Sequence, residues 1–241
     1  MAVERKAYGR VLIKLSGEAL AGDTFGLDPK VLNYIAKEIA EVHEAGVEIA
    51  LVVGGGNFIR GEVFSVEGGI ERTVADQMGM LGTLMNALAL QGVIEKAGVA
   101  TRVQSAISVY QVSEAFIRRR AIRHLEKGRV VVFAAGTGNP YFTTDTAAVL
   151  RALEIEAQAL IKATKVDGVY DKDPRKHPDA KRYETLEYSE AIDQRLAVMD
   201  QTAFTMCREH KLPIIVLDFN EPGALARAVR GEAEGTLVGG E

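Results

Sequence analysis

The stretch that decides the fold is Val130-Val131-Val132-Phe133, followed by Ala134-Ala135-Gly136-Thr137-Gly138-Asn139-Pro140-Tyr141-Phe142-Thr143-Thr144-Asp145. The apolar run predicts a buried strand, and residues 146–153 predict a helix. A strand, a loop of small and hydroxyl residues, and a carboxylate at a helix start form the ligand sites of many α/β proteins. The loop lacks the Gly-Lys-Ser/Thr of a Walker A motif, and Tyr141 stands where a dinucleotide-binding motif has its third glycine. We therefore expect a ligand loop outside both common phosphate motifs.

Strand and helix patterns alternate along most of the chain. Apolar runs predict strands at 11–15, 47–53, 101–107, 129–134, 157–163, 213–219 and 235–240. Helical spacing predicts helices at 31–44, 76–96, 146–153 and 223–230, and Ser113 is expected to cap another that runs to residue 127. This alternation favours a mainly parallel sheet with helices on both faces. We expect one domain over residues 1–241, with a soft lobe boundary near residue 160 and no linker.

The long helix expected at 76–96 carries apolar residues at three- or four-residue spacing, a pattern typical of one buried face. The residues in this stripe are Val74, Met78, Leu81, Met85 and Leu88. We also expect the methionines at 78, 80 and 85 to lie in the core.

Composition excludes several classes of protein. The net charge is -4 over 241 residues, so a global basic field for nucleic acid is absent. The single cysteine, Cys207, rules out an intrachain disulfide framework and fits a reducing compartment. No run approaches the length of a membrane span, and residues 1–10 are charged, so we expect neither a membrane span nor a signal peptide. We expect a cytoplasmic protein.

Two lysines lie at the ends of apolar strands. Lys14 belongs to the first predicted strand, and Lys162 to the strand at 157–163. Such a lysine can extend its ammonium to solvent or pair with a carboxylate. It can equally be a fixed cation aimed at a polyphosphate, with Ser16 and Gly17 offering backbone N–H groups. If both lysines converge on one sheet edge, they make a site for a charge-rich transition state.

Glycines and an arginine follow the second predicted strand. Gly54-Gly55-Gly56 would let the backbone approach a ligand closely, and Arg60 can hold a phosphate in a forked geometry; a tight turn is the alternative. In the opening loop, Thr144 and Asp145 are good helix caps, but a cap does not explain the Gly-Thr-Gly-Asn-Pro ahead of them.

Two further features bear on function. The charged segment at 167–182 holds two prolines and is predicted to be a long loop, which in a compact domain is often functional. The four histidines, at positions 43, 124, 177 and 210, have no metal-ligand spacing, so no protein-bound metal is expected.

Five segments together resemble the bacterial uridylate (UMP) kinases of the amino acid kinase superfamily. They are Lys14-Leu15-Ser16-Gly17 and residues 54–61, 76–80, 136–145 and 162–170, and the resemblance continues through 199–200 and 218–225. It covers nearly the whole chain in order. It implies a three-layer α/β/α sandwich, a homohexamer, and phosphoryl transfer from Mg-ATP to UMP in pyrimidine nucleotide biosynthesis. The lobe at 1–160 would bind UMP and the lobe at 161–241 would bind ATP.

The resemblance also implies roles for individual residues. The catalytic group would be Lys14, Arg60, Asp145 and Lys162, with Asp145 orienting the lysines. ATP would be bound by Lys14, Leu15, Ser16, Gly17, Gly56, Arg60, Thr164, Tyr170 and Asp173. UMP would be bound by Gly55, Asp76, Thr137, Gly138, Asn139, Pro140, Tyr141, Phe142, Thr143 and Thr144, with Asp76 suited to the ribose hydroxyls. The Mg²⁺ would arrive with the nucleotide.

Regulation and rival functions complete the expectations. Members of this family are commonly activated by GTP and inhibited by UTP. Residues 22–27 fall where the family has a GTP-responsive segment, and the arginines at 118–120 could serve the same regulatory interface.

One rival function is that of an amino acid kinase that acts on a carboxylate such as aspartate, acetylglutamate or carbamate. Another is a non-catalytic nucleotide sensor, such as a DNA-binding regulator, which the net charge of -4 disfavours. Both lysines favour an enzyme, and the opening loop with Asp76 favours a nucleotide acceptor.

Overall fold

The computed structural model describes residues 7–22, 25–59, 68–174, 176–194, 196 and 198–240. Within these ranges the strands form one sheet in the order β4-β3-β5-β2-β1-β6-β8-β9-β7. Their bounds are Arg10–Leu15 (β1), Glu48–Val53 (β2), Thr101–Ser105 (β3), Glu114–Ala115 (β4), Val130–Ala134 (β5), Ala159–Thr164 (β6), Thr185–Glu187 (β7), Ile214–Asp218 (β8) and Thr236–Gly239 (β9). All pairings are parallel except that of β8 with β9. The prediction of a mainly parallel sheet is confirmed.

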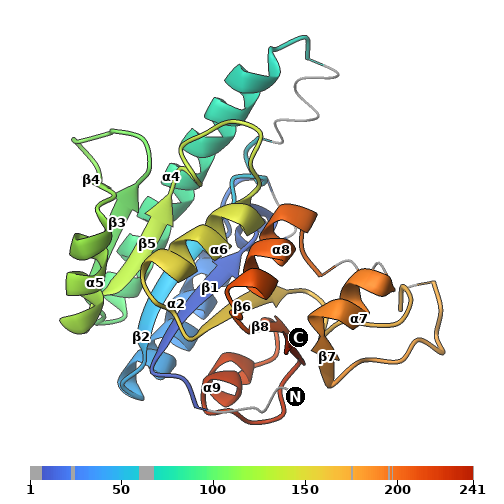
Figure 1. Ribbon diagram of the computed structural model, residues 1–241. Helices are drawn as coiled ribbons and strands as arrows, with labels where there is room; N and C mark the ends of the chain where they lie inside the picture. The colour runs from blue at the N-terminus through green and yellow to red at the C-terminus, as the bar shows by residue number, and fades with distance from the viewer. Residues whose placement is uncertain are drawn as a thin grey trace.

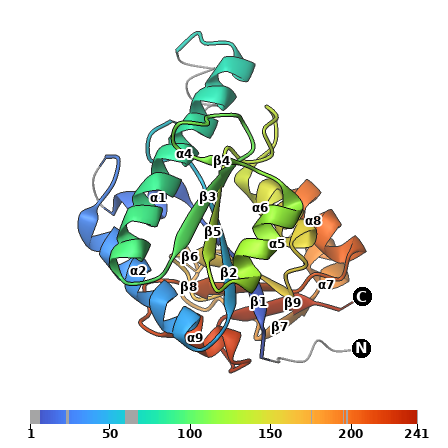
Figure 2. The same ribbon diagram turned by 90° about the vertical axis from the view of Figure 1, so that its left-hand side faces the viewer.

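Helices cover both faces of the sheet. Their bounds are Gly17–Ala21 (α1), Pro29–Glu44 (α2), Arg72–Lys96 (α4), Arg118–Glu126 (α5), Thr144–Glu154 (α6), Tyr188–Asp193 (α7), Gln201–Glu209 (α8) and Ala224–Val229 (α9). Figure 1 shows α6 and α8 in front of the sheet, and Figure 2 shows the sheet between α2 and α4 on one side and α5, α6 and α8 on the other. This arrangement confirms the three-layer α/β/α sandwich. None of the described helices combines the length and apolarity needed to cross a membrane.

The alternation of side chains along β1 separates two apolar cores. Val11, Ile13 and Leu15 pack with residues of α2, α4 and α9. Leu12 is buried on the other face, among residues of α5, α6 and α8. Because successive side chains of a strand point to opposite faces, Lys14 lies on the same face as Leu12, toward α6.

The helix expected to begin at Ser113 begins later, so that prediction was wrong. The Ser113 hydroxyl donates to the carbonyl oxygen of Val109 over 3.4 Å and caps no helix. The next two residues, Glu114 and Ala115, form the short edge strand β4 beside β3. The helix α5 then begins at Arg118. Pairing with a neighbouring strand therefore overrides the local capping signal.

Three of the five residues in the apolar stripe expected on the long helix lie on its exposed side, which corrects the prediction for those three, whereas Leu88 is partly buried and packs against the core. Val74, Leu81 and Met85 are 43%, 49% and 52% exposed. Met80 is buried, whereas Met78 is only half-buried, so the expectation of core methionines holds for Met80 alone. The apolar residues of this helix occur on all of its sides, and its buried side carries several small residues. The buried residues include Ala75, Gly82, Thr83, Leu84, Ala87, Leu90 and Ile94.

Candidate active site

Three charged side chains meet at the carboxyl ends of β1 and β6. Lys14 and Lys162 lie opposite each other in the register of these parallel strands. The Lys14 Nζ lies 3.0 Å from Oδ1 of Asp145, and the Lys162 Nζ lies 3.0 Å from Oδ2. The three side chains are 13%, 18% and 14% exposed, in the order Lys14, Lys162, Asp145. The structure thus brings both lysines to one carboxylate, and we call the three side chains the charged cluster.

The start of α6 places the carboxylate of the charged cluster. Thr143 is the N-cap, and its Oγ1 accepts a hydrogen bond from the N–H of Thr146 over 3.1 Å. Asp145 therefore falls in the first turn, where the helix dipole favours a negative charge. The Thr143 hydroxyl also donates to Oδ2 of Asp200, the N-cap of α8, over 2.5 Å. These contacts fix the end of the opening loop against the C-terminal part of the chain.

Burial and charge act in opposite directions on the charged cluster. Burial raises the pKa of Asp145, but the ammonium groups of Lys14 and Lys162 outweigh it and hold the pKa below its usual value. Burial lowers the pKa of Lys162; the Asp145 charge opposes this effect and the Lys14 charge adds to it. Lys162 also donates to the carbonyl oxygen of Val198 over 2.5 Å. Two ammonium groups and one carboxylate leave a surplus positive charge, which suits an anionic ligand.

The three glycines after β2, which we call the glycine loop, lie against the turn that follows β1. The N–H of Gly54 donates to the carbonyl oxygen of Leu15 over 3.0 Å. A Cβ on Gly17 would lie 2.6 Å from the nitrogen of Gly56, so the two segments approach more closely than any side chain permits. The N–H groups of Gly55 and Gly56 donate to no other described residue. They are available to a ligand.

A first cavity of about 280 Å³ opens between the glycine loop, α4 and the loop after β5. It is lined by Gly55, Gly56, Ile59, Asp76, Gly79, Met80, Thr83, Gly136, Thr137, Asn139, Phe142, Thr143 and Thr144. The structure therefore gathers most of the residues expected to bind UMP. Gly138, Pro140 and Tyr141 belong to the same loop but do not line the cavity.

Asp76 connects α4 with the loop after β5. Its carboxylate accepts hydrogen bonds from the backbone N–H of Tyr141 over 2.8 Å and from Nε of Arg72 over 2.9 Å. Tyr141 adopts a left-handed backbone with φ of 70°, and the Arg72 guanidinium lies 5.9 Å from the centre of its ring. The Asp76 carboxylate is thus shared between the cavity and these protein contacts.

A second cavity, of about 490 Å³, includes Lys162 in its wall. Its lining residues are Lys162, Thr164, Val166, Gly168, Val169, Tyr170, Asp171, Lys172, Asp173, Pro174, Gln194, Leu196, Val198 and Val216. Thr164, Tyr170 and Asp173, which were expected to act together, line the same space. The Tyr170 hydroxyl donates to Asp167 over 2.6 Å, and the Thr164 hydroxyl donates to the carbonyl oxygen of Val166 over 2.7 Å.

Several expected residues have other positions or partners. Arg60 lies outside the described residues. The Leu15 side chain is buried in the core, so only its backbone is available to a ligand. The Ser16 hydroxyl caps α1 by accepting from the N–H of Ala19 over 3.1 Å.

Other lining residues were missed by the sequence reasoning. Gly79, Met80 and Thr83 follow Asp76 at three, four and seven positions, a helical spacing that could have revealed them. Gln194 and Leu196, in the wall of the second cavity, follow α7 and carry no comparable signal.

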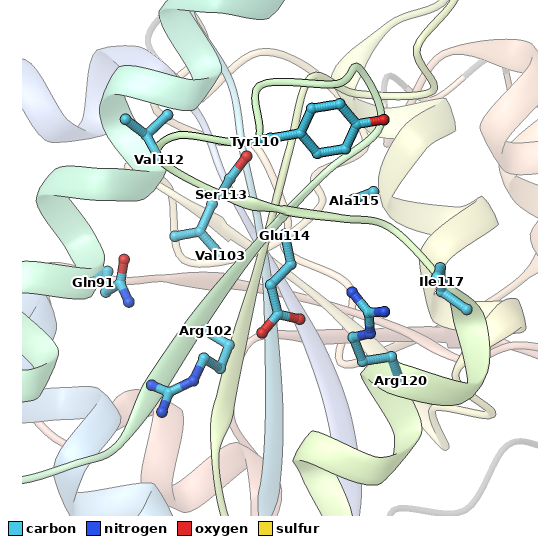
Figure 3. A pocket seen from close by; sticks show the side chains of 10 residues that line it. All are labelled: Gln91, Arg102, Val103, Tyr110, Val112, Ser113, Glu114, Ala115, Ile117 and Arg120. Atoms are coloured by element: carbon cyan, nitrogen blue, oxygen red, sulfur yellow. The ribbon is translucent and has the colours of Figure 1, made fainter.

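A third cavity, of about 600 Å³, is formed by α4, β3, β4 and the start of α5. Figure 3 shows the Glu114 carboxylate between the side chains of Arg102 and Arg120. Glu114 accepts hydrogen bonds from Gln104 and His124, both over 3.0 Å. The remaining lining residues are Gln91, Val103, Tyr110, Val112, Ser113, Ala115 and Ile117.

Comparison with known proteins agrees with this geometry. Residues 9–218 match the amino acid kinase family. Uridylate kinases of Xanthomonas oryzae pv. oryzae and Xanthomonas euvesicatoria pv. vesicatoria are each 57% identical over 97% of this chain and 98% of their own. The crystal structure of UMP kinase from Bacillus anthracis has a TM-score of 0.94 at 42% identity, with 97% of each chain covered. The UMP kinase structure from Ureaplasma parvum has a TM-score of 0.90 at 35% identity, covering 98% of this chain and all of that one (100%).

The fold, the charged cluster and these similarities define a phosphotransferase of the α/β/α type. The chain belongs to the amino acid kinase family and, within it, to the uridylate kinases. The expected family and the expectation of a nucleoside monophosphate kinase are confirmed by these relatives.

Proposed function

We propose that this enzyme transfers the γ-phosphoryl group of Mg-ATP to UMP and releases UDP and ADP, as a step of pyrimidine nucleotide synthesis. The observation that carries the proposal is the position of the charged cluster between two cavities. Lys162 lines the second cavity, and Thr144, the neighbour of Asp145, lines the first. The uridylate kinases at 57% identity support UMP as the acceptor.

The reaction does not require a strong general base. A phosphate oxygen of UMP forms a bond to the γ-phosphorus, and the bond from that phosphorus to the bridging oxygen breaks. The bridging oxygen leaves on ADP with the electron pair. Because the attacking phosphate is already an anion, catalysis consists mainly of positioning and charge neutralisation. In this proposal Lys14 and Lys162 neutralise the transferring group, and Asp145 orients both ammonium groups.

The substrates are assigned to the cavities by their linings. UMP occupies the first cavity, where the glycine loop offers backbone donors, and the nucleoside part of ATP occupies the second. Arg60 completes the phosphate site in this proposal. Mg²⁺ enters with ATP; among the described residues no group of three or more His, Cys, Asp or Glu side chains is placed to hold a metal. The proposed lobe boundary near residue 160 falls within β6, beside the central strand β1.

Assembly and regulation form a second part of the proposal. The exposed apolar residues of α4 support self-association, which we propose yields a homohexamer. GTP activation and UTP inhibition are proposed to act near residues 22–27, of which 23–24 lie outside the described residues, and near the arginines of α5. Arg120 lines the third cavity, whereas Arg118 pairs with Glu156 over 2.5 Å. UMP saturation curves that do not change when GTP is added would contradict the proposed activation by GTP. The cytoplasmic location stays a prediction.

The decisive experiment measures ADP release from Mg-ATP with UMP, CMP, GMP, AMP, aspartate and acetylglutamate as separate acceptors. Turnover with UMP alone is the expected result. Turnover with a carboxylate would instead favour the rival amino acid kinase. Absence of turnover with every acceptor, combined with nucleotide binding, would favour the nucleotide sensor.

A further inference from the structure

A buried pair of asparagines connects α4 with the glycine loop. Asn86, which is fully buried, donates from its side-chain amide to the carbonyl oxygen of Gly54 over 2.6 Å. Its second N–H donates to Oδ1 of Asn57 over 2.7 Å, and Asn57 donates in return to Oδ1 of Asn86 over 2.9 Å. The remaining N–H of Asn57 donates to the carbonyl oxygen of Gly26 over 2.7 Å. Every side-chain donor of the pair is therefore used.

Asn86 contacts the first residue of the glycine loop and lies outside the first cavity. Gly54 is the residue directly after β2, and the next two glycines line the first cavity. The loop touches the helix backbone itself, because a Cβ on Gly55 would lie 2.5 Å from the carbonyl oxygen of Gly79. Asn86 does not line any of the three cavities. Asn86 can therefore influence a bound nucleotide only through its two partners, Gly54 and Asn57.

Thr83, one turn earlier on α4, makes a similar contact with the loop after β5. Its hydroxyl oxygen accepts from the N–H of Ala135 over 2.6 Å and donates to the carbonyl oxygen of Met80 over 2.7 Å. Ala135 has a φ of 62°, a left-handed conformation that residues other than glycine rarely adopt. The buried side of α4 thus holds both loops of the first cavity. Thr83 lines that cavity, so Asn86 is the residue in which positioning and ligand contact can be separated.

We propose that Asn86 is a positioning residue for phosphoryl transfer. By holding the Gly54 carbonyl, it fixes the peptide units that follow, so that the N–H groups of Gly55 and Gly56 stay directed to the transferring phosphate. Donors fixed before the reaction stabilise developing charge without reorganising, whereas a mobile loop would have to be ordered in each turnover. The kinetic consequence of this inference rests on the proposed function.

The test compares two matched variants, Asn86→Ala and Asn57→Ala. Each removes one amide and leaves three polar groups of its partners unpaired: one carbonyl oxygen, and the oxygen and one N–H of the other asparagine. Only Asn86→Ala releases the Gly54 carbonyl. We expect similar losses of thermal stability, but a kcat at least about tenfold lower for Asn86→Ala, with the KM for ATP little changed. Amide hydrogen exchange at Gly54, whose N–H donates to the carbonyl oxygen of Leu15, should accelerate in Asn86→Ala and not in Asn57→Ala.

Equal kcat values for the two variants, with unchanged amide exchange at Gly54, would overturn the assignment. If Asn86→Ala is recovered unfolded, the comparison is repeated with Asn86→Asp and Asn57→Asp, which keep the side-chain volume. Failure of Asn86→Asp to fold while Asn57→Asp folds would make Asn86 a requirement of the fold and would also overturn the proposal. The exchange measurement needs no substrate, so an inactive wild-type enzyme would count against the proposed function and not against the positioning role.

Discussion

Lys14 and Lys162 lie opposite each other on neighbouring parallel strands, and their ammonium nitrogens lie 3.0 Å from the two oxygens of one carboxylate. The backbone register of the sheet therefore sets the spacing of two cations that are far apart in the sequence. An anion that binds between them meets charges that are already in place, so little ordering is needed during the reaction.

Replacing Lys14 should reduce activity far more than stability. In Lys14→Ala, Asp145 keeps its contact with Lys162, so the carboxylate is not left unpaired. Loss of one cation at the developing charge should cost about 3 kcal/mol of transition-state stabilisation, roughly a hundredfold in kcat. Steady-state kinetics and thermal melting check this, with Lys37→Ala at an exposed position of α2 as the control. Parallel losses of activity and melting temperature would contradict the role.

The decline of activity at alkaline pH should reflect the loss of the ammonium proton of Lys162. Burial lowers the pKa of Lys162, with the Lys14 charge adding to the effect, so its ammonium loses its proton at a pH below that of an ordinary lysine. We expect the alkaline decrease in kcat/KM to have its midpoint below about pH 10.4, the usual pKa of lysine. Because arginine stays charged, Lys162→Arg should move this limb to higher pH even if the variant is slower. A limb that stays in place in the variant would assign it to another group.

Asp145 should contribute stability that acid removes. The two ammonium groups depress the pKa of Asp145 in the folded protein, despite the opposing effect of burial. Its contribution is therefore complete above the ordinary carboxyl pKa of about 4 and is lost as the pH falls through the lower folded value. Asp145→Asn should cost about 3 kcal/mol at pH 7, because it leaves two buried ammonium groups without their carboxylate. Denaturant unfolding checks this; a difference that does not shrink on acidification would refute it.

The members of the charged cluster could be predicted from local sequence signals, but their meeting could not. Lys14 and Lys162 each lie in an apolar strand, and Asp145 follows a hydroxyl-rich loop at a helix start. Whether their side chains touch depends on the register of β1 with β6, which is a property of the assembled sheet. The family resemblance supplied this relationship, whereas hydrophobic periodicity alone did not.

The packing of α4 shows why other features could not be predicted. The apolar residues of this helix occur on all of its sides, so their spacing did not indicate which side is buried. That side is selected by its partner, the glycine loop, which approaches the backbone at Gly79 and Gly82. The third cavity likewise depends on the edge strand β4, which tertiary pairing creates after Ser113.

The contact between α4 and the glycine loop predicts a strong effect of one methyl group. A Cβ on Gly55 would lie 2.5 Å from the carbonyl oxygen of Gly79, so Gly55→Ala must push the loop away from the helix. We expect at least a tenfold loss of kcat/KM for UMP, on the order of 1.4 kcal/mol. Gly92→Ala is the matched control, because Gly92 lies in the same helix with no neighbour within 4 Å of its Cβ position. That variant should keep full activity and gain roughly 0.5–1 kcal/mol of stability. Full activity of Gly55→Ala would contradict the close packing.

The exposed apolar residues of α4 should form a contact between copies of the chain. Val74, Leu81 and Met85 lie on one helix and are 43%, 49% and 52% exposed, which is typical of an interaction surface. Leu81→Lys combined with Met85→Lys places two charges in that contact and should shift the protein to smaller species in sedimentation experiments. Burial within the single chain is little changed, so the far-ultraviolet circular dichroism should be retained. Glu41→Lys, at an exposed polar position of α2, should leave the assembly intact. If the double variant sediments like the wild type, α4 is not the assembly surface.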